Sequence, residues 1–392
     1  AELTPFDKST FYLQPDNTVE MGYTDYPFLG QEDKGDRSNA GKAWNPILAL
    51  FTPFSYSPPR NQADAQPPAF HIIMANTRLA VILVSCLFAS FDVAVNAELE
   101  TVKLTHPSGS SAEVFLFGAH VKSFHTAQAP ARDVLFMSNE SYLDGVNPIR
   151  GGIPVVFPVF GSATGFPSHG FARVTTWNLT QVTQAEAEDS PTVATFTMEA
   201  SNITREMWPV EFELVYEVKL FANTLETALH VHNTFTSDIS FHALLHNYLR
   251  VDDARDQGVT VEGLQGLQYY DKVAKVNKTE DRELISFAAQ TDSVYTNAPS
   301  TLVVNIKGVN AADRVVTINT AAFIETGTSQ LDFDSDAVVW NPWSERAKTM
   351  ADFGDDEYIN MVCVEPGRVS EKQILPAGQV YTLQEAITVS DV

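Results

Sequence analysis

A carboxylate at the end of an apolar strand is the first residue of this sequence that could do chemistry. The segment from Tyr358 to Gly367 is apolar until Glu365, after which a Pro-Gly pair predicts a turn. Strand alternation places Met361, Cys363 and Glu365 on one face, so the carboxylate extends an apolar row. Loss of water around it would raise its pKa towards the range of a general base. The alternative is a carboxylate at a strand end that simply reaches solvent.

A strand that carries two histidines is the second candidate. In the segment from Phe241 to Arg250, alternation places polar side chains on one face, namely His242, His246, Tyr248 and Arg250. A lone strand histidine is more often structural, but this row predicts a strand that lines a cleft. The histidines could also bind a metal, yet no H-E-x-x-H pattern accompanies them. We therefore expect no metal ion.

Two arginines lie in neighbouring segments that are rich in glycine and proline. Arg150 lies in residues 147–161, where prolines and glycines among large apolar residues predict a rigid, buried loop. A buried guanidinium needs an anion, which could be an internal carboxylate or a ligand. Residues 166–173 add His169 and Arg173. Two arginines on adjacent loops could bind one phosphate through their forked donors.

β-Strands must position these side chains. From Val210 to Leu220 apolar residues alternate with Glu and Lys, and after a short turn the same period continues from Leu225 to Val231, which predicts a hairpin. No long helical period interrupts the strands, and no Gly-rich phosphate loop follows one. The sequence therefore predicts an all-β fold, a large antiparallel sandwich. Further short strands are expected at Val193–Met198, Thr301–Ile306, Arg314–Ile318 and Tyr381–Val389.

Composition excludes several classes of function. The chain has 392 residues, of which 44% are apolar, and this is enough to bury a large core. A formal charge of −24 repels phosphate backbones and anionic lipids, so neither nucleic acid nor a membrane surface is the expected partner. The only cysteines are Cys86 and Cys363, which offer no disulfide framework and no cysteine-based zinc site.

The first 97 residues have a different character. Residues 1–73 are rich in Pro, Asp, Asn and Gly without a sustained period, and we assign them no function. Residues 74–97 contain a basic residue, a short apolar run and then small residues, the layout of a secretory signal peptide, although a hydrophobic core segment is the alternative. We expect secretion if translation starts at Met74 with cleavage after Ala97, and a cytoplasmic protein otherwise. Four Asn-X-Ser/Thr triplets are compatible with export: Asn139, Asn178, Asn202 and Asn277.

Six spaced blocks carry a specific pattern through residues 98–392. They are IRGGIPVVFPVFG (149–161), HGFAR (169–173), ALLHNYLRVDD (243–253), VEGLQGLQYYDK (261–272), VVWNPW (338–343) and DDEYINMVCVEPG (355–367). Together they closely resemble the glucose-6-phosphate 1-epimerase branch of the aldose 1-epimerase (galactose mutarotase-like) superfamily. The resemblance implies one β-supersandwich domain over residues 98–392 and an isomerase that needs no cofactor.

The resemblance also implies that Glu365 is the general base and His246 the general acid. Mutarotation removes a proton from the anomeric hydroxyl while the ring oxygen gains one; the open aldehyde then rotates and closes on its other face. A carboxylate and an imidazole on opposite sides of the ring suffice for this chemistry. We predict that Glu365 takes the hydroxyl proton and that protonated His246 serves the ring oxygen.

The same resemblance implies how the substrate is held. Arg150 and Arg173 match substrate-binding arginines expected near a 6-phosphate, and Asp292 takes the place of an acidic residue that holds sugar hydroxyls. His169 is implied to be a cleft residue. One departure is Ser168, where the family commonly has Gln, and the shorter side chain loses reach to the sugar.

Two other functions are open to this sequence, a secreted mutarotase of unphosphorylated hexose and a non-catalytic carbohydrate-binding protein. The arginines favour an anionic sugar, whereas Ser168 and the signal-like segment favour a changed substrate. Retention of both Glu365 and His246 argues against a binding protein. We expect a small-molecule sugar phosphate as the ligand of a monomer, without nucleic acid and without stable membrane insertion.

Overall fold

The computed structural model describes residues 98–326 and 329–392. The extension at 1–73 and the signal-like segment at 74–97 lie outside these residues. Within them the chain forms three antiparallel sheets with a few short helices, which confirms the predicted all-β fold.

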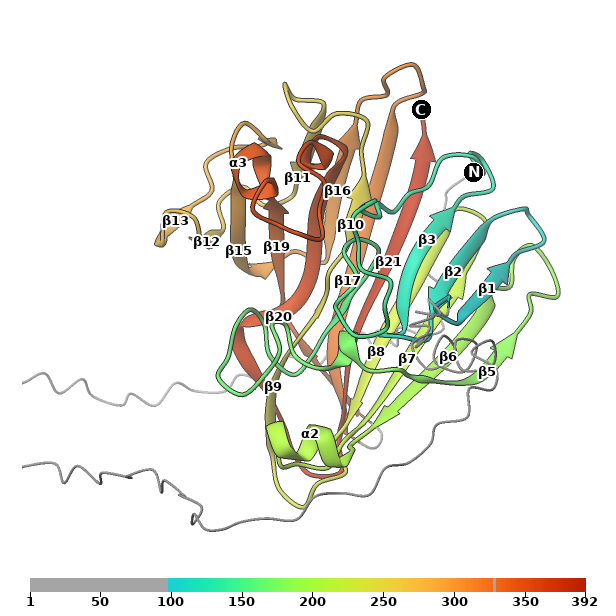
Figure 1. The fold of residues 1–392 in the computed structure, drawn as a ribbon, viewed down its shortest axis with the longest axis vertical. Coiled ribbons are helices and arrows are strands. Elements are labelled where there is room, and N and C mark those ends of the chain that lie inside the picture. Colours follow the sequence, from blue (N-terminus) through green and yellow to red (C-terminus); the bar gives the residue numbers. More distant parts are fainter. Residues whose placement is uncertain (1–97, 327–328) are drawn as a thin grey trace, which may run out of the picture. The chain divides into compact units, whose positions relative to one another are not determined.

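The largest sheet has ten strands and contains the predicted hairpin. Its members are β5 (Asn178–Thr183), β6 (Thr192–Glu199), β7 (Glu213–Leu220), β8 (Thr224–His232), β11 (Val259–Glu262), β14 (Ile285–Ser286), β16 (Thr301–Ile306), β17 (Arg314–Thr326), β18 (Ser329–Phe333) and β21 (Val380–Asp391). The order is β14-β11-β16-β17-β21-β8-β7-β6-β5, and β18 pairs with β17. In Figure 1 this sheet extends to β5 at the right of the view.

The period-two residues of the hairpin behave as predicted. On β7 the side chains of Leu214, Tyr216, Val218 and Leu220 are fully buried, and the residues between them are partly exposed. The strand begins at Glu213 rather than at Val210. The predicted strand at Arg314 is also longer than expected, because β17 continues to pair with β21 as far as Glu325.

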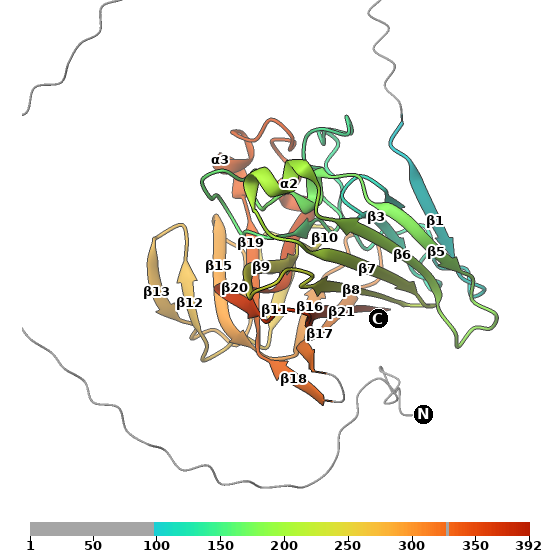
Figure 2. The ribbon, with the colours of Figure 1, turned by 90° about the horizontal axis from the view of Figure 1, so that it is seen from below.

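A second sheet of eight strands carries the candidate base, Glu365, and Asp292. Its members are β4 (Val155–Val156), β9 (Ile239–Leu245), β10 (Tyr248–Arg250), β12 (Gln268–Asp271), β13 (Val276–Thr279), β15 (Thr291–Ala298), β19 (Ser335–Asn341) and β20 (Met361–Leu375). The order is β13-β12-β15-β19-β20-β9-β4, and β10 pairs with β20. Both views place β13 at the opposite side of the domain from β5 (Figures 1 and 2).

The remaining elements are short. A three-stranded sheet consists of β1 (Thr101–Thr105), β2 (Ser111–Phe115) and β3 (His120–His125). The helices are α2 (Asn202–Met207), α3 (Trp343–Ala347) and the 3-10 turns η1 (Ala172–Val174) and η2 (Glu357–Asn360). Among the residues that the structure describes, no helix has the length and apolar character needed to cross a membrane.

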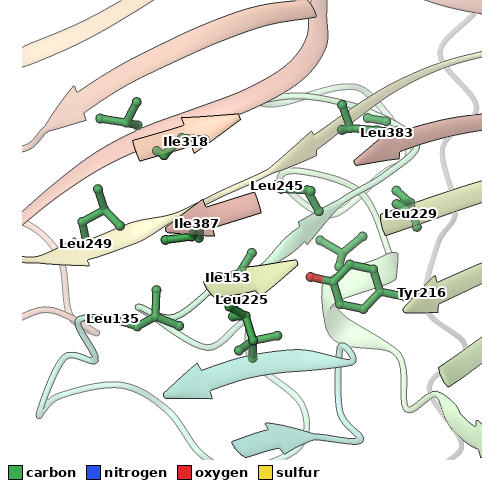
Figure 3. Packing of buried hydrophobic residues seen from close by; sticks show 14 of the residues in the cluster. Leu135, Ile153, Tyr216, Leu225, Leu229, Leu245, Leu249, Ile318, Leu383 and Ile387 are labelled. Atoms are coloured by element: carbon green, nitrogen blue, oxygen red, sulfur yellow. The ribbon is translucent and has the colours of Figure 1, made fainter. Parts of the chain in front are cut away.

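One hydrophobic core joins the sheets. Leu229 and Ile387 of the ten-stranded sheet and Leu245 and Leu249 of the eight-stranded sheet are all fully buried in the same cluster, as Figure 3 shows. Sheet faces that share one apolar interior form a sandwich, and this rigid interior holds the strands that carry the candidate site.

Candidate active site

A cavity of about 240 Å³ lies beside β15, β19 and β20 of the eight-stranded sheet. The segment from Arg150 to Arg173, the region of α3 and three further residues, His246, Lys272 and Gln290, supply the rest of its wall. The six predicted site residues lie in separate elements and loops between Arg150 and Glu365, and all six line this cavity. The lining residues are Arg150, Phe160, Ser168, His169, Arg173, His246, Lys272, Gln290, Asp292, Val338, Trp340, Arg346, Met350 and Glu365.

A gap in the strand ladder brings His246 to the cavity. β9 pairs with β20 only as far as Leu244, and pairing resumes with β10 at Tyr248, so the residues between these two positions leave the ladder. Pro366, which has no N–H to give to either neighbouring strand, lies in the facing stretch of β20. The break frees His246 from strand geometry and lets its ring approach the strand that carries Glu365.

Asn247, which lies in this gap, connects the two sheets through hydrogen bonds of its side chain. Its side-chain amide donates to the backbone oxygen of Val364 at 3.2 Å and to Glu385 Oε2 at 2.6 Å. Glu385 is fully buried on β21, and its other oxygen accepts from the Thr227 hydroxyl at 3.2 Å. Asn247 follows His246, and Val364 precedes Glu365. One buried amide thus fixes the backbones of both reactive residues against the opposite sheet.

The predicted acid and base face each other. His246 Nδ1 lies 3.5 Å from Glu365 Oε2, and neither atom has a hydrogen-bond partner among the described residues. Glu365 is 1% exposed and His246 7%. The imidazole stacks on the Tyr248 ring, with centroids 4.7 Å apart and planes inclined by 9°, which fixes its orientation. The carboxylate therefore does not reach bulk solvent, which was the alternative for this residue.

Burial moves the two pKa values in opposite directions. Desolvation, reinforced by the charge of Asp292, raises the pKa of Glu365 well above its ordinary value. Desolvation, reinforced by His169 and the cavity arginines, lowers the pKa of His246 well below its ordinary value. Both shifts favour a protonated carboxyl facing a neutral imidazole over a carboxylate facing an imidazolium. This state holds as many protons as a carboxylate facing an imidazolium.

Arg173 is a buried cation that meets no acidic partner within residues 98–326 and 329–392. It is 7% exposed, its Nη2 donates to the Ser168 carbonyl at 2.7 Å, and its Nε has no partner among the described residues. Burial lowers its pKa to about 10, and nearby Arg150 contributes to the shift. A guanidinium in this setting needs an anion from outside the chain.

Arg150 combines the two roles that its sequence context left open. Its guanidinium pairs with Asp352, with Nη2 at 2.9 Å from Oδ2 and Nε at 3.1 Å from the same oxygen. Its Nη1 donates to the Tyr248 hydroxyl at 2.9 Å. Arg150 is thus an internal salt-bridge partner that also lines the cavity. Through Tyr248 it supports the ring on which His246 rests.

His169 is held in an unusual backbone conformation. Its φ of 63° lies in the left-handed region, and Gly170, with φ of 78°, follows directly. A Cβ on Gly170 would collide with the Phe157 carbonyl, so glycine is required there. This turn points His169 into the cavity, where its ring lies 5.7 Å from the His246 ring, centroid to centroid. Its Nδ1 has no partner among the described residues.

Asp292 lies on β15 beside Trp340, its register partner on β19. Lys272 Nζ lies 3.2 Å from Asp292 Oδ2, and both residues line the cavity. Burial raises the pKa of Asp292, and the ammonium group only partly offsets this effect. The pair places a hydrogen-bond donor beside an acceptor, an arrangement that can bind two hydroxyls on neighbouring carbon atoms.

The predicted row of polar side chains from His242 to Arg250 is corrected by the structure. His242 Nδ1 accepts from the Phe160 backbone N–H at 3.2 Å, and Arg250 lies over the Phe136 ring at 5.6 Å. Neither lines the cavity, and Tyr248 does not line it either, so His246 is the member of the predicted row that does. The ladder gap after Leu245 is the reason, because it ends the strict alternation from which the row was predicted.

Three candidate metal ligands lie close together in the described chain. His246, Cys363 and Glu365 place one ligand atom each within 4.8 Å of the others. Burial raises the pKa of the Cys363 thiol and that of the Glu365 carboxyl well above their usual ranges. Metal ligands must lose these protons, so the cluster is poorly prepared for a cation that also faces two arginines.

Sequence reasoning missed several cavity residues. Lys272 ends one of the six blocks and could have been found there, whereas Gln290 and Arg346 had no local signal. Asp352 lies just before the last block and gave no hint that it would pair with Arg150. Their contribution depends on which loops the fold brings together.

Comparison with known proteins identifies the family of this chain. The family model for aldose 1-epimerase matches residues 100–388. A relative from Cenchrus ciliaris, named "putative glucose-6-phosphate 1-epimerase", is 33% identical over 290 residues, which cover 72% of this chain and 82% of that protein. A relative of the same name from Escherichia coli K12 is 33% identical over 298 residues, covering 75% of this chain and 91% of that protein.

A solved structure shares the fold. The crystal structure of a protein described as a "putative mutarotase" from Salmonella typhimurium superposes with a TM-score of 0.64 at 28% identity. The match covers 75% of this chain and 92% of that one.

Proposed function

Because the chain belongs to the aldose 1-epimerase family of isomerases, we propose that it interconverts the α and β anomers of a hexose 6-phosphate. Glucose 6-phosphate is the expected substrate, since relatives that are 33% identical carry its name. Glu365 and His246 would act as base and acid, and the cavity arginines would bind the phosphate.

Arg173 is the single observation that carries the phosphate in this proposal. Its buried guanidinium has no carboxylate partner among the described residues and keeps an unused donor. Arg150, whose charge Asp352 balances, lies in the same wall. A bound phosphate would accept hydrogen bonds from Arg173 and supply the missing negative charge.

The charge of the cavity points the same way. Arg150, Arg173, Lys272 and Arg346 line it, against only two acidic residues, Asp292 and Glu365. The whole chain carries a net charge of −24, so a cationic cavity is a local exception. Such a surplus favours an anionic sugar over a neutral one.

The reaction uses the pair in a closed cycle. Glu365 removes the proton from the anomeric hydroxyl, the C1–O5 bond breaks as C1 becomes an aldehyde, and His246 gives its proton to O5. After rotation about the C1–C2 bond, the C5 hydroxyl attacks the other face of C1. His246 then takes back the C5 hydroxyl proton while Glu365 returns a proton to O1, so both groups end as they began.

Substrate binding would prepare the starting protonation state. Arg150 and Arg173 lower the pKa of His246 through their positive charge. A phosphate beside them cancels part of this charge, so the pKa of His246 rises and the proton moves from Glu365 to the imidazole across the 3.5 Å gap. The protonated carboxyl and neutral imidazole that burial favours are also the state that ring opening produces.

The test is anomer exchange measured by NMR on the complete chain, with glucose 6-phosphate and glucose compared at equal concentrations. We expect acceleration of the phosphosugar and little of glucose. Arg173→Met should raise the KM for glucose 6-phosphate by about 10- to 100-fold, the worth of a charged hydrogen bond. It should leave any exchange of glucose unchanged.

Arg205→Met is the matched control, because Arg205 is exposed, pairs with Glu211 and lies outside the cavity. Equal acceleration of both sugars, insensitive to Arg173→Met, would replace the proposal by a mutarotase of unphosphorylated hexose. Binding of either sugar without exchange would replace it by a carbohydrate-binding protein.

A further inference from the structure

The four Asn-X-Ser/Thr triplets are a sequence feature that epimerase chemistry does not use. Asn139 lies in a loop, Asn202 is the first residue of α2, Asn178 begins β5 and Asn277 lies on β13. All four residues are exposed, and none lines the cavity. A bulky group on any of them would project into solvent and leave the candidate site open.

The side-chain amides of these residues are unused by the fold. Other asparagines hold the chain together: Asn341 Nδ2 donates to the Tyr358 and Met361 carbonyls at 2.8 Å each, and Asn233 Nδ2 donates to the Leu375 carbonyl at 2.8 Å. Within residues 98–326 and 329–392, the side-chain amides of Asn139, Asn178, Asn202 and Asn277 make no hydrogen bond. Attachment of a glycan to these amide nitrogens would therefore cost no native contact.

Two of the four asparagines lie on open sheet edges. β5 ends the ten-stranded sheet and β13 ends the eight-stranded sheet, and every residue of both strands is exposed. The two edges face opposite sides of the domain (Figures 1 and 2). They also expose apolar side chains, with Leu179 and Val182 of β5 at 40% and Val276 of β13 at 46%. Such edges are sites for unwanted strand pairing between molecules.

We propose that this protein is an N-glycoprotein with acceptor sites at Asn139, Asn178, Asn202 and Asn277, and that the glycans on Asn178 and Asn277 cover the two open sheet edges. The modification requires the secretory route, which is the route that the signal-like segment at residues 74–97 predicts. A bulky, hydrophilic glycan beside an edge strand blocks the approach of a second molecule. Charged side chains have this effect on the edge strands of many other proteins.

The test is expression in insect cells from Met74, the start for which we expect secretion, followed by digestion with peptide-N-glycosidase, which converts each glycosylated Asn to Asp. We expect a loss of mass on digestion and a conversion at all four positions by peptide mass spectrometry. Thr180→Ala and Thr279→Ala should each remove one glycan. The matched variants Thr180→Ser and Thr279→Ser preserve the triplets and should keep every glycan.

The edge-covering role has its own measurement. The double variant Asn178→Gln/Asn277→Gln should form soluble aggregates on size-exclusion chromatography, whereas Asn139→Gln/Asn202→Gln should elute like the wild type. Equal elution of the two variants would overturn the edge-covering role. A chain that is recovered from medium and cells without any glycosidase-sensitive mass would overturn the modification itself. Anomer exchange is expected to be unchanged by digestion, so these outcomes are independent of the enzyme assignment.

Discussion

Two buried carboxyl groups on neighbouring parts of this fold have opposite surroundings. Glu365 on β20 and Glu385 on β21 are 1% and 0% exposed, and burial raises the pKa of both. Both oxygens of Glu385 accept hydrogen bonds, one from Asn247 and one from Thr227. Glu365 lines the cavity, and its Oε2 has no hydrogen-bond partner in the part of the chain that the structure describes.

The difference separates a structural group from a reactive one. A buried polar group is normally satisfied by the protein, and an unsatisfied one is a cost to stability. Glu385 follows the rule and joins the two sheets through Asn247. Glu365 is an exception to this rule, and it lines a cavity that a ligand can enter. We therefore expect a substrate hydroxyl to donate the hydrogen bond that the carboxyl lacks.

The sharpest test of this contrast exchanges each carboxyl for an amide. Glu365→Gln should reduce the anomer exchange rate of glucose 6-phosphate by about 10²- to 10⁴-fold, because it removes the base. Glu385→Gln is the control and should keep most of the activity. The exchange rate is measured by NMR and the fold by thermal unfolding. A folded Glu365→Gln variant with full activity would refute the assignment of the base.

The cavity arginines extend the contrast between satisfied and unsatisfied groups. Arg150→Met should lower the free energy of unfolding by about 1.5–3 kcal/mol, because Asp352 loses its charged hydrogen bonds. Arg173→Met should leave the stability unchanged or increase it, since a buried cation without an acidic partner is removed. Urea unfolding of both variants without ligand decides this, and equal losses would show that Arg173 is also structurally paired.

Glu385, the carboxyl group with hydrogen-bond partners, should contribute measurably to the free energy of unfolding. Glu385→Leu removes the acceptor of the Asn247 amide and should lower the free energy of unfolding by about 1–3 kcal/mol. Because Asn247 also holds Val364, we expect a decrease in kcat without a matching change in KM. Denaturant unfolding and kinetics on the same preparation measure both. An unchanged stability would mean that the Asn247 amide needs no acidic partner.

The pH dependence of stability gives a smaller effect with a defined sign. The pKa of Glu385 is about 8 in the fold against an ordinary 4.5, so the folded state binds its proton more tightly. Its contribution to stability is complete below pH 4.5 and is lost as the pH rises through 8. A histidine with a lowered pKa, such as His246, has the opposite effect. Its contribution makes the free energy of unfolding rise with pH, and this rise is complete above about pH 6.5.

We therefore expect the free energy of unfolding to fall between about pH 6.5 and 8 in the wild type, and less steeply in Glu385→Gln. Urea unfolding at several pH values measures the two slopes. Parallel slopes would mean that Glu385 does not titrate in this range.

The smallest expected effect concerns the cavity rim. Ser168 is exposed and lines the cavity, and its backbone carbonyl already accepts from Arg173. Ser168→Gln should lower the KM for the preferred sugar by about 2- to 10-fold if the longer amide gains one neutral hydrogen bond. Ser168→Ala is the control and should change little. A higher KM for Ser168→Gln would indicate that the cavity is adapted to the shorter side chain.

Much of the fold and the membership of the site could be predicted from local sequence. The alternation in β7 marked the buried residues correctly, because a strand's period of two is written directly in neighbouring residues. The blocks that contain Arg150, Arg173, His246 and Glu365 all reached one cavity, and so did Asp292, which lies outside the blocks. The prediction failed where a strand is interrupted, since the gap after Leu245 removed His242 and Arg250 from the expected row.

The sequence by itself determined the all-β class, the strands and the residue types that could move a proton or bind an anion. Only the tertiary structure decided which of these groups have a hydrogen-bond or salt-bridge partner within the protein. Arg150 meets Asp352 across 202 residues and Asn247 meets Glu385 across 138, whereas Arg173 and Glu365 are left for a ligand. Local patterns record the period of each strand, but such pairings depend on sheet register and on the packing of the two sheets, which no short segment contains.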